Sequence, residues 1–204
     1  MFCRNLYGAV KLGEGTFGEV YLVQYKDQRV AMKVIPIGGT YAINNESQKS
    51  FETILPEVII SKELSDLRSP TLMNRTDGFI RLVGFHLVQG TYPRALRTAW
   101  KKYAKISTSL NDDPSILPKN QHYILLCYEI GGIELEKFEL DSIEQAYSIT
   151  YQVAFSLLIA EEELFFEHRD LHDGNILIQK DYSVAVCRCV SRSYWYMMTI
   201  ITLF

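Results

Sequence analysis

The sequence predicts an α+β protein in which a strand-rich N-terminal part precedes a helical part. Three observations predict this order. Residues 8–35 contain strand-like runs around a glycine-rich turn, residues 142–165 have the apolar spacing of a long helix, and a short apolar run at 176–179 follows a polar loop. Strands first and a long helix later are typical of an α+β chain with a sheet-rich front lobe.

The composition indicates an ordinary globular protein. The chain has 204 residues, of which 48% are hydrophobic and 22% charged, so it can form one domain or two small lobes with a sizeable core. The formal net charge of -3 provides no basic field for gripping nucleic acid, and we predict no direct nucleic-acid binding. The same charge is compatible with a basic peptide as partner.

The cysteines and the apolar segments exclude several other classes. None of the four cysteines forms a C-x-x-C pair or a His–Cys spacing typical of zinc sites, and Cys127 lies in an apolar run, as expected of a small core residue. This cysteine usage favours an intracellular, reducing compartment. The N-terminus shows no secretory signal pattern, and the apolar stretch 194–204 is too short to cross a bilayer as a helix, so we expect no membrane span.

Turn residues delimit the strands. After the glycine-rich turn, a second strand is expected at 20–25 and a third at 29–35, separated by the polar turn 26–28. Two further strands are expected at 79–88 and 122–129.

Apolar spacing and capping signals predict the helices. An apolar stripe predicts a helix over 51–67, with Pro56 near its start, where a missing N–H costs little. A second helix is expected at 93–105, followed by a turn at 111–114. Ser142 and Gln145 form a capping box for the long helix, which is expected to end near residue 165.

The glycine-rich turn has the pattern Gly13-x-Gly15-x-x-Gly18. Glycines at these spacings let a backbone fold over a polyphosphate with its amides near the oxygens. By itself the pattern also fits a hairpin turn or a dinucleotide-binding fold. Here a strand rather than a helix follows the glycines, which favours the strand–loop–strand arrangement of protein kinases.

Lys33 lies on the third predicted strand, where kinases place the lysine that pairs with the α- and β-phosphates of the nucleotide. Its sequence neighbours are apolar, so its charge needs a partner. Glu57 on the helix at 51–67 is the best candidate, and Glu52 and Glu63 are the competitors. An ion pair with Glu57 would hold the Lys33 ammonium against phosphate.

The strongest signal in the chain is the run His168-Arg169-Asp170-Leu171-His172-Asp173-Gly174-Asn175. Phosphoryl transfer needs a carboxylate near the attacking hydroxyl and oxygen ligands for magnesium. We assign the first role to Asp170 and the second to the side-chain carbonyl of Asn175. The preceding glycine loop and Lys33, in this order, weigh against the alternative that His168 and Asp170 only cap a helix.

One position departs from most kinases. They carry a lysine two residues after the aspartate, whereas this chain has His172, followed by Asp173 and Gly174. Small-molecule phosphotransferases that share the kinase fold also tend to show His and Gly in this loop, and they are an alternative on this motif.

Taken in order, several stretches resemble the haspin-type family of atypical serine/threonine protein kinases. They are residues 12–20, 54–64, 78–80, 88–93, 131–133 and 166–175, and they are spread in this order over most of the range 11–180. The Leu-Pro-Glu start of the helix and the Gln-Gly-Thr-Tyr-Pro segment are typical of this family rather than of kinases in general.

The resemblance implies a protein-kinase-like fold with a complete sheet-rich N-terminal lobe at 1–130, which carries an inserted helix–loop segment. Only the beginning of the helical C-terminal lobe is expected, at 131–182, followed by an atypical apolar tail at 183–204. The resemblance also implies phosphorylation of a threonine near the N-terminus of a histone tail, in mitosis, by a nuclear, chromatin-associated enzyme.

The resemblance implies ATP and magnesium as cofactors, with a hinge at Tyr128, Glu129 and Gly131 for the adenine. The catalytic residues it implies are Asp170, Lys33 and Glu57, and the metal ligand is Asn175. The residues expected at ATP are Gly13, Glu14, Gly15, Gly18, Val20, Ala31, Lys33, Glu129 and Gly131.

A second metal-binding carboxylate is expected beyond the hairpin that follows Asn175, in a D-F-G motif or the family's D-Y-T. We expect the returning strand at 183–186, so that Arg188 falls where the acid belongs. Asp181 starts a D-Y-S run, but it follows Asn175 too closely to leave room for that strand, and we interpret it as a turn residue.

The activation segment and most of the rear lobe are expected to be missing. Apolar residues spread around much of the long helix, so we expect exposed apolar surface that promotes association. The tail at 194–204 could cover part of it, or could be the end of a truncated or misread gene. Two alternatives to an active kinase stay open: an inactive module that binds nucleotide or a partner, and a small-molecule phosphotransferase.

Overall fold

The computed structural model describes residues 6–107, 109–180 and 197–201, and the chain divides into two compact units. The first unit comprises the residues up to Ile60 together with Leu82–Ile130. The second comprises Ser61–Arg81 and the residues from Gly131 onward. The first unit is rich in strands and the second contains the long helix, so the predicted α+β class is confirmed.

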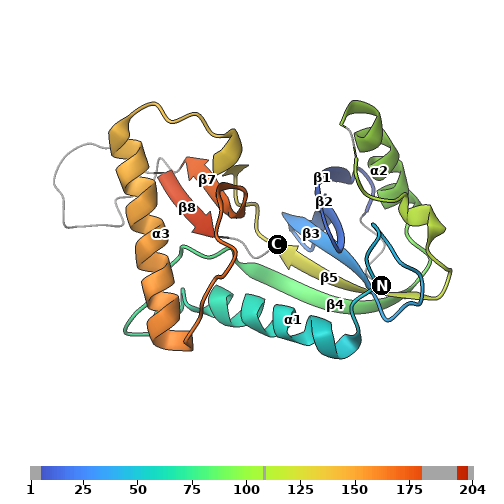
Figure 1. The fold of residues 1–204 in the computed structure, drawn as a ribbon, viewed down its shortest axis with the longest axis horizontal. Coiled ribbons are helices and arrows are strands. Elements are labelled where there is room, and N and C mark those ends of the chain that lie inside the picture. The colour runs from blue at the N-terminus through green and yellow to red at the C-terminus, as the bar shows by residue number, and fades with distance from the viewer. Residues whose placement is uncertain (1–5, 108, 181–196, 202–204) are drawn as a thin grey trace. The chain divides into compact units, whose positions relative to one another are not determined.

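Antiparallel strands form a five-stranded sheet in the first unit, in the order β1-β2-β3-β5-β4 (Figure 1). The strands are β1 (Val10–Gly15), β2 (Gly18–Tyr25), β3 (Gln28–Ile37), β4 (Leu82–Gly90) and β5 (Gln121–Tyr128). Gly15 pairs with Gly18 across the β1–β2 hairpin, so the tight turn consists of Thr16 and Phe17. The strands lie where the sequence places them, except that β4 begins at Leu82 rather than at 79.

The core of the first unit lies between one face of this sheet and helix α2 (Arg94–Ile106), which contacts β1 (Figure 1). Side chains alternate along a strand, so every second residue of β2, including Tyr21 and Val23, faces this core. Leu96 of α2 packs against them. Cys127 is buried in the same cluster, and burial raises the pKa of its thiol to about 12, as expected of an inert core residue.

Helix α1 (Phe51–Asp66) begins after Ser50, whose hydroxyl accepts a hydrogen bond from the amide of Thr53 over 3.2 Å. The predicted helix at 51–67 is confirmed. Pro56 lies inside the helix rather than at its start, so the carbonyl of Glu52 lacks the usual amide donor four residues later.

Helix α3 (Ile143–Leu164) is the long helix of the second unit. Half of the predicted capping box is present, since Ser142 Oγ accepts a hydrogen bond from the amide of Gln145 over 3.3 Å. The side chain of Gln145 accepts from the amide of Asp141 over 2.8 Å rather than from that of Ser142. The helix ends at Phe165, whose φ of 53° is left-handed. Its buried face packs in a hydrophobic cluster whose members include Leu64, Leu67, Phe79, Ile149, Val153, Ala160, Ile176 and Ile178.

A small antiparallel sheet accompanies α3, in the order β6 (Ile133–Glu134), β7 (Ile176–Lys180) and β8 (Met197–Ile201). The expected returning strand at 183–186 lies outside the described residues, as do Asp181 and Arg188. The strand that pairs with β7 is β8, with Ile178 opposite Thr199.

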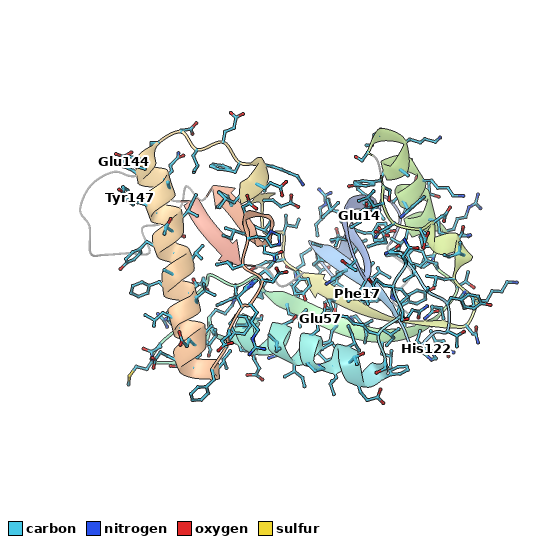
Figure 2. The ribbon with its side chains drawn as sticks, viewed as in Figure 1. Glu14, Phe17, Glu57, His122, Glu144 and Tyr147 are labelled. Atoms are coloured by element: carbon cyan, nitrogen blue, oxygen red, sulfur yellow. The ribbon has the colours of Figure 1, made fainter. Side chains whose placement is uncertain are left out.

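The expected exposed apolar surface is present on α3. Figure 2 shows Tyr147 pointing away from the helix, and this side chain is 69% exposed. The other exposed apolar residues of α3 are Ile143, Tyr151, Phe155 and Leu158. The backbone of β8 contacts α3, so part of the apolar tail does lie against the helix. Among the helices that the structure describes, none is both long and apolar enough to span a membrane.

Candidate active site

Lys33 and Glu57 form the ion pair that the sequence predicts, both within the first unit. Lys33 Nζ donates to Glu57 Oε1 over 2.9 Å, and Figure 2 labels Glu57 on α1. The competitors are not placed this way: Glu52 and Glu63 are exposed on α1. The second oxygen of Glu57 accepts a hydrogen bond from Lys49 Nζ over 2.8 Å, a contact that the sequence did not predict.

The shared carboxylate stays ionised because two cations surround it. Burial by itself raises the pKa of Glu57, but the charges of Lys33 and Lys49 and their hydrogen bonds outweigh burial and hold the pKa below its ordinary value. Lys49 Nζ also lies 4.5 Å from the centroid of the Phe17 ring, at the turn of the glycine loop. Glu57 and Lys49 thus connect Lys33 on the sheet to the turn of the loop.

The three glycines of the loop differ in what the protein requires of them. A Cβ added at Gly18 would lie 2.3 Å from the carbonyl oxygen of Val34, so the close approach of β3 demands glycine there. Around Gly13 and Gly15, no heavy atom of the described structure lies within 4 Å of an added Cβ, and neither has a left-handed φ. The folded chain alone therefore does not require these two glycines, whereas a ligand in contact with the backbone would.

The carboxylate of Glu14, one of the residues expected at ATP, binds other parts of the protein. It accepts hydrogen bonds from the Ser109 hydroxyl over 2.7 Å and from the amide of Leu110 over 2.8 Å, and it pairs with Lys11 Nζ at 2.5 Å. Burial raises the pKa of Glu14, but these donors outweigh burial and hold it below the ordinary value. Glu14, labelled in Figure 2, therefore anchors the loop to the segment after α2.

A buried ion cluster that was not predicted from the sequence involves Lys11, Glu14 and Glu19. The side chain of Lys11 is 0% exposed, and its ammonium is 2.5 Å from Glu19 Oε2 as well as from Glu14. It also lies 5.3 Å from the Trp100 ring centroid and 4.5 Å from that of Tyr103, both on α2. Burial raises the pKa of Glu19 above its ordinary value, against the lowering effect of Lys11 and Asn111.

The other expected nucleotide contacts lie on the strands and at the end of β5. Val20 and Ala31 are half-buried on β2 and β3. Tyr128 ends β5 opposite Ala31 and is buried, whereas Glu129 is half-buried. Gly131 belongs to the second unit, where an added Cβ would lie 2.5 Å from Leu177 Cδ1. An added Cβ at Gly131 would therefore require the Leu177 side chain to shift.

The loop His168–Asn175 lies in the second unit and is held by its own hydrogen bonds. Asp170 is exposed, and its amide donates to the carbonyl of His168 over 2.8 Å. Asn175 is buried, and its Nδ2 donates to the carbonyl of Asp170 over 2.9 Å. Arg169 between them has a left-handed φ of 61°. The loop therefore presents the Asp170 carboxylate to solvent on a backbone that Asn175 fixes.

His172, the departure from the usual lysine, has a structural task. Its Nδ1 accepts a hydrogen bond from the amide of Gly174 over 3.1 Å and so caps the 3₁₀ turn Asp173–Asn175. A Cβ at Gly174 would lie 2.8 Å from the imidazole, so a larger residue there would require His172 to move out of its capping position.

Asn175 fits the role of one magnesium ligand. Its Nδ2 is bound to Asp170, which turns Oδ1 to the opposite edge of the amide, and amide oxygens are accepted by magnesium. In the part of the chain that the structure describes, no group of three or more His, Cys, Asp or Glu side chains could hold a metal ion. A magnesium ion there would take the side-chain oxygen of Asn175 as one of its ligands.

An antiparallel sheet with a glycine loop and a Lys–Glu pair, followed by an exposed aspartate and a buried asparagine in one loop, defines the class of protein kinases. The sequence model of the haspin-like kinase domain matches residues 3–201. The chain belongs to this haspin kinase family. Membership favours the protein-kinase hypothesis over the small-molecule phosphotransferase.

Curated relatives carry the same family name. The chain is 49% identical over 172 residues to the serine/threonine-protein kinase haspin of Mus musculus, covering 83% of this chain and 23% of the relative. It is 38% identical over 182 residues to the haspin homolog of Drosophila melanogaster, covering 86% of this chain and 32% of the relative. It is also 38% identical over 176 residues to the haspin homolog of Arabidopsis thaliana, covering 85% of this chain and 28% of the relative. The chain thus spans less than a third of the length of these relatives.

Proposed function

We propose that this chain binds ATP and transfers its γ-phosphoryl group to a serine or threonine hydroxyl of a protein substrate. The observation that carries the proposal is the open backbone at Gly13 and Gly15, on the same unit as the Lys33–Glu57 pair. Two glycines that the fold does not require, beside a lysine held by a carboxylate, provide close-approaching amides and a fixed positive charge. Both suit a nucleotide's phosphates.

Each residue has one task in this proposal. Glu57 holds Lys33 so that its ammonium faces the phosphates, and Asp170 orients the substrate hydroxyl and accepts its proton. Asn175 fixes the backbone of Asp170 and offers its amide oxygen to magnesium. When bound, magnesium supplies neutralisation of the phosphate charge.

The proposed substrate is a threonine near the N-terminus of a histone tail, phosphorylated in the nucleus during mitosis. Family membership supports this choice, because the relatives are named haspin kinases. The formal net charge of -3 also suits a basic peptide better than an acidic one.

The test is phosphoryl transfer by the purified chain with magnesium, radiolabelled ATP and a histone-tail peptide. A second peptide with valine in place of the threonine tests whether the hydroxyl is the acceptor. Asp170→Ala is the inactive control, and Lys62→Met is the matched surface control, because Lys62 is an exposed lysine whose partner is Asp66 on the same helix. Label on the threonine peptide with the parent chain and Lys62→Met, but not with Asp170→Ala, supports the proposal. Equal labelling by the parent and Asp170→Ala contradicts it.

A second candidate is a module that binds nucleotide without transferring phosphate. It is favoured by the sequence, because Arg188 falls where the second metal-binding acid is expected. Nucleotide binding that depends on Lys33, with no label on the peptide, would select this candidate.

A further inference from the structure

Two asparagines from outside the glycine loop hold the backbone of its turn. Asn111 Nδ2 donates to the carbonyl of Gly15 over 3.1 Å, and Asn44 Nδ2 donates to the carbonyl of Thr16 over 3.1 Å. Asn111 follows α2 and Asn44 precedes α1, so the two donors come from segments far apart in the sequence. They bind consecutive carbonyls at the turn of the β1–β2 hairpin.

Fixing these carbonyls also fixes the direction of two amides. In a trans peptide the C=O and N–H groups point in opposite directions, and the described chain contains no cis peptide. The amide of Thr16 therefore points away from Asn111, and the amide of Phe17 points away from Asn44. Backbone amides at such a turn are the groups that bind phosphate oxygens in glycine loops.

Further hydrogen bonds hold the two asparagines in place. The amide of Asn44 donates to Asp112 Oδ2, and the amide of Asp112 donates to Asn44 Oδ1, each over 2.8 Å. Asn111 Nδ2 donates in addition to Glu19 Oε1 over 2.9 Å, and Glu19 is buried beside Lys11. Both partners of this amide group are acceptors, so the nitrogen, not the oxygen, faces the loop.

The same segment also holds the side-chain end of the loop, since Ser109 and Leu110 bind the Glu14 carboxylate. Residues 109–112 and Asn44 therefore form a brace that contacts the loop at Glu14, Gly15 and Thr16. The loop itself supplies none of these donors.

We propose that Asn44 and Asn111 are positioning residues that hold the glycine loop in the shape that receives a nucleotide's phosphates. The inference rests on the proposed nucleotide binding for its consequence, but the brace is a property of the free protein. Preorganising the amides before the nucleotide arrives lowers the entropy lost on binding. Loosening the brace should therefore weaken nucleotide binding more than it weakens the fold.

The test compares Asn44→Gly, Asn111→Ala and the double variant with matched controls. Asn44 has a left-handed φ of 54°, so glycine removes its side chain without backbone strain. Asn45→Gly is the control, because Asn45 is adjacent, exposed and left-handed at 63°. Asn120→Ala, at an exposed asparagine, is the control for Asn111. Two quantities are measured: hydrogen exchange of the amides at 13–18 without nucleotide, and affinity for a fluorescent ATP analogue.

The brace predicts that exchange at 13–18 rises about tenfold in Asn44→Gly and in Asn111→Ala, and that nucleotide affinity falls about tenfold. In both variants, hydrogen exchange in β3 and β5 should match that of the parent. The two control variants should match the parent in exchange at 13–18 and in nucleotide affinity. Unchanged exchange at 13–18 overturns the inference, and so does a uniform rise across the sheet, which would indicate a general structural role. Parent-like nucleotide affinity despite a loosened loop also overturns it. If the parent itself binds no nucleotide while the variants loosen the loop, the proposed function fails and the brace stands.

Discussion

Lys33 Nζ donates to Glu57 Oε1 over 2.9 Å, which joins β3 to α1 across 24 positions of the sequence. Both side chains are mostly buried, with exposed fractions of 8% and 18%. An ammonium at this depth requires a carboxylate, because burying either charge alone is strongly unfavourable. The ion pair therefore fixes the Lys33 side chain and holds α1 against β3.

Replacing Lys33 should impair nucleotide binding more than folding. In Lys33→Met, Glu57 keeps Lys49 as a partner. We therefore expect the free energy of unfolding to fall by only about 1–2 kcal/mol, which lowers the melting temperature by a few degrees. Affinity for ATP should fall by about tenfold to a hundredfold, since one charge-assisted contact is lost. Titration with a fluorescent nucleotide measures this, with Lys62→Met as the surface-lysine control. Equal affinities of Lys33→Met and the parent would contradict a role for Lys33 at the phosphates.

The loss of stability at acidic pH should depend in part on Glu57. Its pKa in the folded chain lies below the ordinary value of 4.5, so ionised Glu57 stabilises the fold above that pH and the contribution is lost as the pH falls through the folded pKa. Glu57→Gln should therefore be less stable than the parent at neutral pH, and the difference should shrink below about pH 4.5.

Urea unfolding of the parent and Glu57→Gln at a series of pH values measures this difference. Comparing the two curves is necessary because Glu14 titrates with the same sign and Glu19, whose pKa is raised, with the opposite sign. A difference that stays constant down to about pH 3 would contradict the prediction.

Gly15→Ala and Gly18→Ala should separate binding from folding. The methyl at position 18 would meet the Val34 carbonyl at 2.3 Å, so Gly18→Ala should lower the free energy of unfolding by about 1–3 kcal/mol. The methyl at position 15 meets open space, so Gly15→Ala should stay within about 0.5 kcal/mol of the parent. Thermal unfolding checks both.

Nucleotide affinity should show the reverse effect for Gly15→Ala, with a loss of about tenfold, because the methyl would enter the space in which a phosphate approaches the backbone. Isothermal titration with ATP measures the loss. Gly15→Ala with unaltered affinity would mean that no ligand uses this open space.

Lys49 should couple the turn of the glycine loop to α1. Its ammonium is 4.5 Å from the Phe17 ring centroid, and its side chain is 26% exposed, so the contact is partly screened. A double-mutant cycle with Lys49→Met and Phe17→Leu should give a coupling free energy of about 0.5–1 kcal/mol. Additive effects of the two substitutions on urea unfolding would show that the contact contributes nothing.

Local pattern was enough to predict most of the helices and strands. The glycine spacing, the strand that carries Lys33 and the capping box at Ser142 each depend on neighbours within a few residues, where sequence and conformation are directly linked. The Lys33–Glu57 pair spans 24 positions, and the need of a lysine among apolar neighbours for a carboxylate indicated it.

Only the tertiary structure decided the rest. Asn111 meets Gly15 across 96 positions and Asn44 meets Thr16 across 28, and a polar side chain in a turn gives no sign of its distant acceptor. The pairing of β7 with β8 was not predicted for a related reason: an apolar run such as 197–201 does not show which strand it will pair with, because contacts along the whole edge decide this. The sequence by itself thus determined the order of the elements and the glycine-loop and catalytic-loop signatures, whereas long-range contacts decided how the loop is braced and which strand pairs with β7.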